Sequence, residues 1–331
     1  MQSSFFFTHR NTKFVHLKSP RLKLFHSIQK FTSKKQTIVT LGTFDGVHLG
    51  HRKIIDRLVA TAKQESCESV ILTFFPHPRM VLQDGSSVKL LNTMDEKAQL
   101  LEQLEVDNLI IHPFDQEFSR LTAEEFVEEV LVKQLNLKKI IIGYDHRFGR
   151  NRTANIDDLK EFGKQFNFEV EEISAQEIDD VAVSSTKIRN ALEEGNIPLA
   201  NSYLSYPYFL TGLVTKGKSI GRTIDFPTAN LDLKDNHKLI PKKGVYIVSS
   251  THKEALVFGM MNIGYNPTVK GDKKTIEVHF FNFNEDLYNQ KIQIAILNRI
   301  RDEIKFDTLD QLKTQLESDK KTAMAWLEIQ D

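Results

Sequence analysis

The strongest constraint on the fold is an alternation of strand-like and helix-like stretches between residues 36 and 145. Apolar runs such as IVTL (38–41) and VILTFF (70–75) alternate with stretches such as 51–64 and 94–106, in which apolar residues recur with helical spacing. Strands that alternate with helices form parallel sheets, and continuous apolar runs suit strands that are buried on both faces. The pattern predicts an α/β domain, a parallel sheet with helices on both faces.

The pattern changes near residue 196, where helical spacing gives way to short strand-like runs. These runs are 208–215, 244–250, 255–263, 276–283 and 291–300. Short strands separated by turn residues indicate a small antiparallel barrel. The change predicts two domains, 22–197 and 198–331, which suits a chain of 331 residues.

A helix is expected after the barrel, over residues 308–329. Its Leu309, Leu312 and Leu316 have the spacing of a single helix face. Trp326, the only tryptophan of the chain, is expected to anchor this helix on the core rather than to serve as a platform for a ligand.

Composition limits what the protein can be. The 44 basic and 44 acidic residues cancel, so no overall field favours nucleic acid or an acidic partner. The single Cys67 excludes an internal disulfide framework, fits a reducing compartment and is expected to be a packing residue. No apolar run approaches the roughly 20 residues that span a bilayer. We therefore expect a cytoplasmic protein, monomeric or weakly oligomeric, that binds neither nucleic acid nor membrane.

The N-terminus differs from the rest in charge. Residues 1–44 hold eight Lys or Arg and no Asp or Glu, which leaves a net charge of −8 for the remainder. A basic, hydroxyl-containing and acid-free start also suits a transit peptide. We favour a disordered extension or a start codon assigned too far upstream for residues 1–21, and no secretory apolar region follows the FFF run.

A glycine turn between the first strand and the first helix is a candidate anion site. In GTFDGVHLGH (42–51), Gly42 and Gly46 permit close backbone approach, and a helix starting near His51 presents its positive end. His48 and His51 would then face the same place. Two histidines alone make a poor zinc site, which usually has three or four ligands. A phosphate site fits better, because imidazole donors can stabilise charge developing on phosphates.

The stretch SSTKIRNALEEG (184–195) is a second candidate anion site. Its hydroxyl residues Ser184, Ser185 and Thr186 suit a helix N-cap, where the helix dipole favours an anion. Arg189 projects from the first turn, and Gly195 suits the C-cap. An ordinary capped helix explains this stretch taken alone. Its position downstream of the histidine motif in a βα chain favours the anion site.

Three blocks of the first half carry a family resemblance. FDGVHLGH resembles the His-x-Gly-His signature of nucleotidyltransferases that cleave ATP between its α- and β-phosphates. GYDHRFGRNRTAN (143–155) resembles the Gly-x-Asp-Phe-x-Phe-Gly segment of bacterial FAD synthetases, and 184–195 resembles their Ser-Ser-Thr-x-Ile-Arg block. FFPHP (74–78) also matches, with His77 either structural or in contact with a ligand. His146 stands where that family commonly has Phe, a change that bears on how a flavin or adenine ring is stacked.

The resemblance implies roles for matching residues. The implied catalytic residues are His48, His51 and Arg189. The implied ATP- and phosphate-binding residues are Gly42, Phe44, Asp45, Gly46, Ser184, Ser185 and Thr186. The implied flavin or nucleotide loop contains Gly143, Asp145, Phe148 and Arg152.

A second resemblance begins in GLVTKGKSIGRTIDFPTANLDL (212–233). A glycine loop with Gly217 and Gly221 can wrap a phosphate, and Lys218 and Arg222 add positive charge. FPTAN (226–230) resembles the Pro-Thr-Ala-Asn motif of riboflavin kinases, whose threonine and asparagine help to hold a magnesium–nucleotide. The matching residues are Thr228 and Asn230, which implies that they bind Mg²⁺. The family usually has glycine where Asp225 stands.

Glu277 is the candidate base of this second site. It lies in an alternating strand with Ile276, Val278 and Phe280 on the opposite face. An isolated Glu on a strand is usually a solvated surface residue. The resemblance to the kinases' Ile-Glu-x-His segment implies instead that Glu277 accepts the proton of the phosphoryl acceptor. Arg301 matches a family position that helps to close the flavin site, the alternative being an exposed arginine at a helix start.

The five blocks occur in the order of the bifunctional bacterial riboflavin kinase/FMN adenylyltransferase family, and the resemblance covers about 22–331. It implies a Rossmann-like nucleotidyltransferase domain followed by a small antiparallel barrel kinase domain. The implied chemistry phosphorylates riboflavin to FMN and adenylylates FMN to FAD, with ATP as co-substrate and Mg²⁺ as cofactor. Two alternatives stay open: another His-x-Gly-His adenylyltransferase, or an inactive module that binds flavin or nucleotide.

Overall fold

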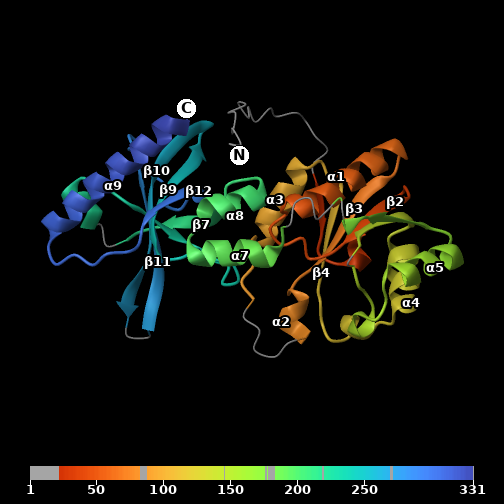
Figure 1. Cartoon of the computed structure of the whole chain (residues 1–331). Coiled ribbons are helices and arrows are strands. Elements are labelled where there is room, and N and C mark those ends of the chain that lie inside the picture. Colours follow the sequence, from red (N-terminus) through yellow and green to blue (C-terminus); the bar gives the residue numbers. More distant parts are fainter. Residues whose placement is uncertain are drawn as a thin grey trace, which may run out of the picture.

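The computed structural model describes residues 22–330, apart from 83–87, 145, 176, 178–182, 218–219 and 269–270. Figure 1 shows a sheet flanked by helices in the N-terminal half and a barrel with a long helix in the C-terminal half. Two helices, α7 (Ser185–Glu194) and α8 (Ile197–Leu204), lie between these parts. Among the described residues, no helix combines the length and apolar character that crossing a membrane requires.

The N-terminal sheet has six parallel strands in the order β1-β4-β3-β2-β5-β6. They are β1 (Lys23–Phe25), β2 (Thr37–Leu41), β3 (Glu68–Phe74), β4 (Asn108–His112), β5 (Leu137–Gly143) and β6 (Glu169–Ile173). Alternate residues of β2 enter two different cores: Ile38 packs with Leu58 of α1, and Val39 packs with Val127 of η3. A strand with two buried faces reads as a continuous apolar run. The predicted sheet with helices on both faces is confirmed.

The helical segments of this half include one π-helix, η3. The described segments are η1 (Ile28–Lys30), α1 (Leu49–Gln64), α2 (Pro78–Leu82), α3 (Met94–Gln103), η2 (Phe118–Arg120), α4 (Ala123–Glu125), η3 (Phe126–Gln134), η4 (Arg150–Arg152) and α5 (Ile156–Phe166). The helical stretch 122–135 divides into α4 and the π-helix η3, where the N–H of Leu135 donates to the carbonyl of Val130. Cys67 packs against the core on the α1 side, as expected for a packing residue.

Both edge strands lie outside the predicted elements. β1 has three residues, and β6 has the sequence EVEEI with only Ile173 buried. An edge strand meets solvent along one side and needs no long apolar run. The periodicity that identifies the central strands is therefore absent at the edges.

The C-terminal half is a closed antiparallel barrel with the strand order β10-β11-β8-β7-β12-β9. Its strands are β7 (Phe209–Thr215), β8 (Ala229–Asp232), β9 (Gly244–His252), β10 (Ala255–Thr268), β11 (Gly271–Phe280) and β12 (Lys291–Arg301), and η5 (Ile220–Ile224) lies in the loop before β8. Alternate residues such as Val248, Ile263, Ile276 and Ile294 fill the interior. The antiparallel barrel is confirmed. β8, with four residues, is a strand that the sequence pattern did not indicate.

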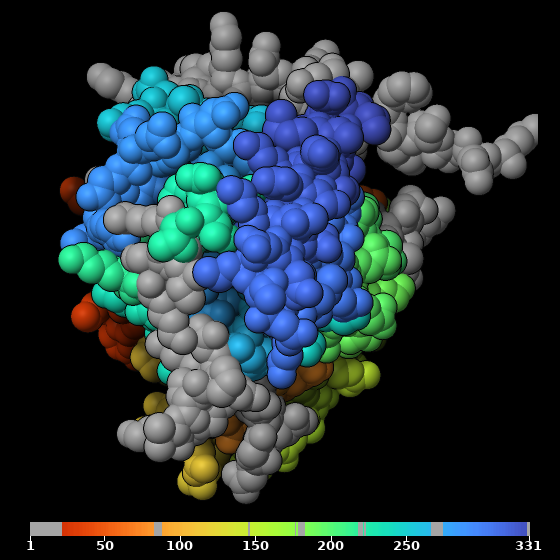
Figure 2. Space-filling view, turned by 90° about the vertical axis from the view of Figure 1, so that its left-hand side faces the viewer, coloured from red at the N-terminus to blue at the C-terminus, as the bar shows by residue number. Residues whose placement is uncertain are grey.

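The C-terminal helix α9 (Leu309–Gln330) covers the outside of the barrel. Figure 2 shows it as a dark blue ridge across the face that it covers. Leu312, Leu316 and Trp326 pack against an outer cluster that includes Phe226 of the loop before β8, as expected for a helix anchored by its tryptophan. Leu309 differs from the expectation, because it is 52% exposed at the first position of the helix.

The barrel shares its hydrophobic core with the two helices that follow the sheet. Ile188 and Leu192 of α7 and Leu204 of α8 belong to the same buried cluster as the barrel interior, and so does Leu91, which precedes α3. Both helices lie in the region where the first predicted domain ends, at residue 197. The ranges 22–197 and 198–331 remain a prediction. Residues 1–21 lie outside the described part of the chain.

Candidate functional sites

The glycine turn after β2 is held by tight packing. Gly46 has φ +91°, and a Cβ there would lie 2.7 Å from Cδ1 of Leu91. Phe44 (φ +43°) is buried, and its ring lies edge-on to that of His51, with 5.2 Å between centroids. A Cβ at Gly42 would lie 3.3 Å from the Phe44 ring. Both glycines therefore leave room for neighbouring side chains, with Phe44 packed inside the turn, and the close approach of an anion stays a prediction.

His48 and His51 meet at the start of α1. His48 is the N-cap, so the helix begins two residues earlier than expected, and the two rings stack with centroids 3.6 Å apart. Burial and the Arg189 guanidinium lower the pKa of His48 to about 4, and burial and the charge of His48 lower the pKa of His51 well below its usual value. Neither Nδ1 atom has a hydrogen-bond partner among the described residues. Two buried, neutral imidazoles thus lie side by side, each with an Nδ1 atom that is unpartnered within the described part of the chain.

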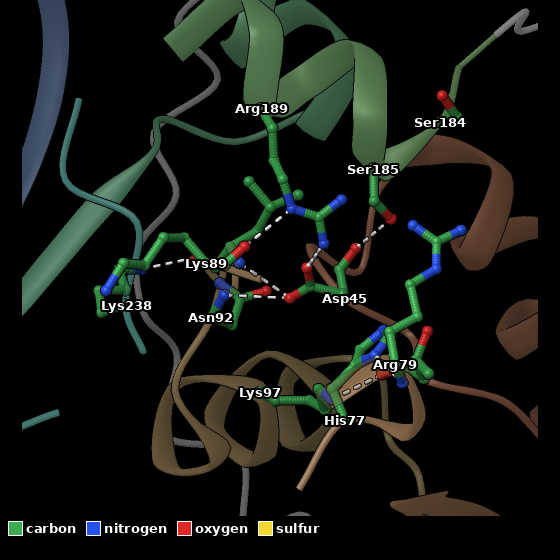
Figure 3. Close-up of polar contacts among 12 residues, drawn as sticks. Asp45, His77, Arg79, Lys89, Asn92, Lys97, Ser184, Ser185, Arg189 and Lys238 are labelled. Carbon is green, nitrogen blue, oxygen red and sulfur yellow. Dashed lines mark hydrogen bonds and ion pairs between the residues drawn. The ribbon is translucent and has the colours of Figure 1, made fainter. Parts of the chain in front are cut away.

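Arg189 reaches this turn from α7. Its guanidinium forms an ion pair with the buried Asp45, and its Nε donates to the carbonyl of Lys89 over 2.8 Å (Figure 3). The other carboxylate oxygen of Asp45 accepts from the backbone N–H of Leu91 over 2.9 Å. The negatively charged carboxylate of Asp45 would repel a phosphate. Asp45, expected among the phosphate-binding residues, fixes Arg189 beside the histidines.

The predicted N-cap of α7 is confirmed. Ser184 caps the helix by accepting from the N–H of Lys187, and Gly195 ends it with φ +83°. Ser185 turns toward the glycine turn and donates to the carbonyl of Asp45 over 2.9 Å, whereas Ser184 lies farther from Asp45 (Figure 3). Thr186 is exposed. The helix start therefore lies beside the histidine turn, with Ser185 joining the two segments.

Lys97 of α3 is a charged residue of this site that sequence reasoning missed. Its buried Nζ donates to the carbonyl of Thr43 over 2.6 Å, and its charge acts on both His51 and His77. Burial lowers the pKa of Lys97 to about 8, against the opposing effect of Asp45. Burial and Arg189 lower the pKa of His77 to about 4. No motif surrounds Lys97 in the sequence; the packing of α3 places it here.

The expected flavin or nucleotide loop begins where β5 ends. Gly143 is the last residue of that strand, and Arg152 is exposed in η4. Phe148 is buried in the core on the η3 side, with its ring nearly parallel to that of His146. Phe148 therefore anchors the loop to this core. Asp145 lies outside the described residues.

The second site lies on the outer face of the barrel. Glu277 of β11 pairs in register with Asn230 of β8, while Ile276 and Val278 point into the core. The hydroxyl of Thr228 donates to a carboxylate oxygen of Glu277 over 3.4 Å. On the other side of Glu277, Asn262 of β10 is its register partner and was not singled out in the sequence. The predicted alternation around Glu277 is confirmed.

Two glycines bring the loop before β8 close to these residues. A Cβ at Gly217 would lie 2.1 Å from Nδ2 of Asn230, and one at Gly221 would lie 2.1 Å from the carbonyl oxygen of Phe226. Asp225 has φ +66°, a left-handed conformation that glycine adopts freely and Asp tolerates better than most residues. That conformation explains why a glycine is usual there. Lys218 and the side chain of Arg222 lie outside what the structure describes.

The donors around Glu277 suit magnesium only with help from a ligand. Thr228 and Asn230 carry the hard oxygen donors that Mg²⁺ prefers. Among the described residues, no group of three or more His, Cys, Asp or Glu could hold a metal by itself. Mg²⁺ in such a place is normally bound by one or two protein groups together with substrate phosphates. The residues present fit that arrangement.

Arg301 has a structural partner. It is the last residue of β12, and its guanidinium grips the buried Asp319 of α9 through two nitrogens, at 2.8 and 2.6 Å. Its Nη1 donates to the carbonyl of Asp302. The alternative of a helix-start arginine is wrong, because Arg301 ends a strand. Its role in closing the flavin site stays a prediction.

Comparisons with known proteins agree with the two halves. Residues 30–187 match the family described as FAD synthetase, and residues 204–327 match the family described as riboflavin kinase. A bifunctional riboflavin kinase/FMN adenylyltransferase of Buchnera aphidicola subsp. Schizaphis graminum is 39% identical over 298 residues, which are 89% of this chain and 94% of that protein. The protein of the same name from Escherichia coli K12 is 35% identical over 305 residues, or 91% and 97%.

A solved structure extends the likeness to the fold. It is described as a macrolide-efflux protein from Streptococcus pneumoniae, and it has a TM-score of 0.83 and 32% identity, covering 92% of this chain and 99% of that one. The similarity therefore includes both the sheet and the barrel. This structural similarity and the relatives of matching length show that the chain belongs to the bifunctional riboflavin kinase/FMN adenylyltransferase family.

Proposed function

We propose that this chain makes FAD in two steps at two separate sites, a function supported by its family and by the order of its halves. The barrel half phosphorylates riboflavin to FMN with ATP. The sheet half joins FMN to the adenylyl group of a second ATP and releases pyrophosphate. The stacked His48–His51 pair beside Arg189 is the observation that carries the second step.

In the sheet half, an oxygen of the FMN phosphate attacks the α-phosphorus of ATP as the bond to the β-phosphate breaks. We assign His48 and His51 to the phosphates, where a neutral imidazole can donate one N–H. Arg189 and Lys97 bring positive charge toward the leaving pyrophosphate. Asp45 and Ser185 hold the turn and α7 together so that these groups converge. The remaining predicted contacts, including Ser184, Thr186 and the loop at Gly143, Phe148 and Arg152, are proposed to surround the nucleotide and flavin.

In the barrel half, we assign Glu277 as the base that takes the proton of the riboflavin 5′-hydroxyl, whose oxygen attacks the γ-phosphorus of ATP. Thr228 and Asn230 would bind Mg²⁺ together with the phosphates, and bound Mg²⁺ offsets the charge of those phosphates. The backbone at Gly217 and Gly221 wraps the phosphates, with charge added by Lys218 and Arg222. Thr228, within 3.4 Å of Glu277, orients the carboxylate in the free enzyme.

Two other functions were open from the sequence. A different His-x-Gly-His adenylyltransferase would have no use for the kinase barrel, which spans more than a third of this chain. An inactive binding module would have no need of a buried histidine pair or of Glu277 beside Thr228. The bifunctional enzyme uses all of these features.

One experiment separates the three possibilities. The purified protein is incubated with riboflavin, ATP and Mg²⁺, and the flavins are separated by chromatography at intervals. FMN is expected first and FAD afterwards, and a parallel incubation that starts from FMN should give FAD directly. Riboflavin alone at the end would refute the proposal. FMN without FAD from either starting flavin would remove the sheet half of it.

We also propose that the protein works in the cytoplasm as a monomer or weak oligomer, without nucleic acid or membrane. Its substrates ATP, riboflavin and FMN are small soluble molecules, and its single cysteine suits a reducing compartment. Gel filtration over a range of protein concentrations would test the oligomeric state. A concentration-independent assembly of several chains would contradict it.

A further inference from the structure

A short segment, residues 89–92, runs between the sheet half and the barrel half. On the barrel side, the N–H of Leu90 donates to the carbonyl of His237 over 2.7 Å, and the carbonyl of Leu90 accepts from the N–H of Leu239 over 2.8 Å. Leu91 is fully buried in the core that the barrel shares with α7 and α8. The segment is therefore fixed to the loop between β8 and β9.

Lys238, at the centre of that loop, contacts both this segment and the start of α3. Its Nζ donates to the carbonyl of Leu91 and to a carboxylate oxygen of Glu96, both over 2.6 Å. Lys238 and Glu96 are 4% and 1% exposed, so the pair is shielded from water and salt. Glu96 also accepts from the N–H of Thr211 in β7, which extends the contact to the first barrel strand.

The opposite side of the same segment holds the catalytic groups of the sheet half. The carbonyl of Lys89 accepts from Nε of Arg189, and the N–H groups of Leu91 and Asn92 point to the carboxylate of Asp45. Asp45 in turn is ion-paired with Arg189. Figure 3 shows the line from Lys238 through this segment to Asp45 and Arg189. The peptide unit between Leu91 and Asn92, followed by the carboxylate of Asp45, thus connects the ammonium of Lys238 to the guanidinium of Arg189.

We propose that Lys238, although it lies in the kinase half, is a positioning residue for adenylyl transfer: it fixes segment 89–92, which sets the place of Arg189. The inference rests on the proposed function of the sheet half. Lys238 itself touches no reacting atom. Its loss leaves the Leu91 carbonyl without its buried donor and lets the segment move. A displacement of about 1 Å of a positioned group can cost 10²-fold in rate.

The test must avoid a variant that merely fails to fold. Lys238→Met alone leaves Glu96 as a buried charge without its partner, which is strongly destabilising. The variant Lys238→Met/Glu96→Gln removes both charges together. Lys242→Met is the matched control, because Lys242 follows in the same loop and its ion pair with Asp302 is solvent-exposed. Thermal unfolding of all variants is recorded first.

Kinetics then decide the role. For the double variant, kcat of FAD formation from FMN should fall tenfold or more while KM for ATP changes less than twofold, and riboflavin phosphorylation should stay within twofold of the unchanged chain. The same two changes made in an Arg189→Lys background should cost less than threefold, because a residue that acts through Arg189 loses its effect once Arg189 is altered. Lys242→Met should leave both activities unchanged.

Three results would overturn the inference. They are unchanged FAD formation by the double variant, an equal loss of both activities, and an undiminished loss in the Arg189→Lys background. If the unchanged chain made no FAD from FMN, the proposed function would fall and take this inference with it. The first three results leave the proposed function intact, so the two failures are distinguishable.

Discussion

The imidazole rings of His48 and His51 lie nearly parallel, with centroids 3.6 Å apart and planes inclined by 19°. Two imidazolium cations at this distance would repel each other strongly in a buried place. Burial keeps both pKa values well below 6.5, so both rings are neutral at physiological pH. A neutral pair can approach the phosphates of ATP as N–H donors without taking up protons during the reaction.

The first prediction concerns pH. The ring-proton NMR signal of His48 should not shift between pH 8 and about 5.5, because its pKa lies near 4. The unfolded chain takes up a proton on this residue near pH 6.5, before the folded chain does, so this histidine lowers the free energy of unfolding as pH falls from 6.5 towards 4. His48→Gln identifies the signal by its loss. A midpoint near 6.5 would contradict the buried, neutral ring.

Replacing His51 separates the two activities. His51→Ala removes a donor at the phosphates and should lower kcat of FAD formation from FMN by about 10² or more. Riboflavin phosphorylation should be unchanged, so FMN accumulates when the variant receives riboflavin and ATP. The measurement is a time course of all three flavins. FAD formation at an undiminished rate would remove His51 from the chemistry.

Replacing Glu277 should have the reverse effect. Glu277→Gln keeps the size of the side chain and the contact with Thr228 but removes the base, so riboflavin phosphorylation should fall by about 10² to 10⁴. FAD formation from added FMN should be intact, because Glu277 lies on the outer face of the barrel. Loss of both activities in a folded protein would show that the two sites do not work independently.

A substitution at Gly217 tests the proposed phosphate loop of the barrel through steric hindrance alone. In Gly217→Ala the new Cβ would lie 2.1 Å from Nδ2 of Asn230, so one of the two must move. Riboflavin phosphorylation should fall at least tenfold, through a higher KM for ATP, lower kcat or both. FAD formation from FMN serves as the internal control. A kinase rate within twofold of the unchanged chain would mean that Asn230 tolerates displacement.

The role of Arg301 can be assigned by measuring both the stability of the protein and KM for riboflavin. Arg301→Met leaves Asp319 buried without a partner and should cost about 3 kcal/mol of stability. Arg301→Met/Asp319→Leu removes both charges and should recover most of that loss. KM for riboflavin is then measured on the double variant. An unchanged KM makes Arg301 an anchor of α9 only, whereas a raised KM supports the predicted role at the flavin site.

Much of the fold and part of each site could be predicted from local patterns. The spacing of His48 and His51 and the hydroxyls at 184–186 are signals within a few residues, and the structure brings the histidines together and places Ser184 as the cap of α7. Glu277 was expected to oppose its apolar neighbours, as it does. The edge strands β1 and β6 were missed because an exposed edge carries no apolar pattern.

The contacts of the sites were less predictable. Lys97 stands in an ordinary amphipathic helix, and nothing near it in the chain indicates that its ammonium lies buried against the carbonyl of Thr43. Asp45 stood among the expected phosphate-binding residues, yet its carboxylate is taken up by Arg189 and backbone N–H groups. Asn262 could not be identified from the sequence, because only the register of β10 and β11 places it beside Glu277.

The sequence by itself determined the parallel and antiparallel halves, the glycine turns and the family, because periodicity and turn chemistry act over a few residues. Tertiary structure decided which remote groups meet: Asp45 with Arg189, 144 positions away, and Glu96 with Lys238, 142 positions away. The barrel core includes α7, α8 and Leu91, so α7 brings Arg189 to the turn at Asp45, and the loop between β8 and β9 brings Lys238 to Glu96. These contacts depend on how the halves dock, and no local pattern encodes them.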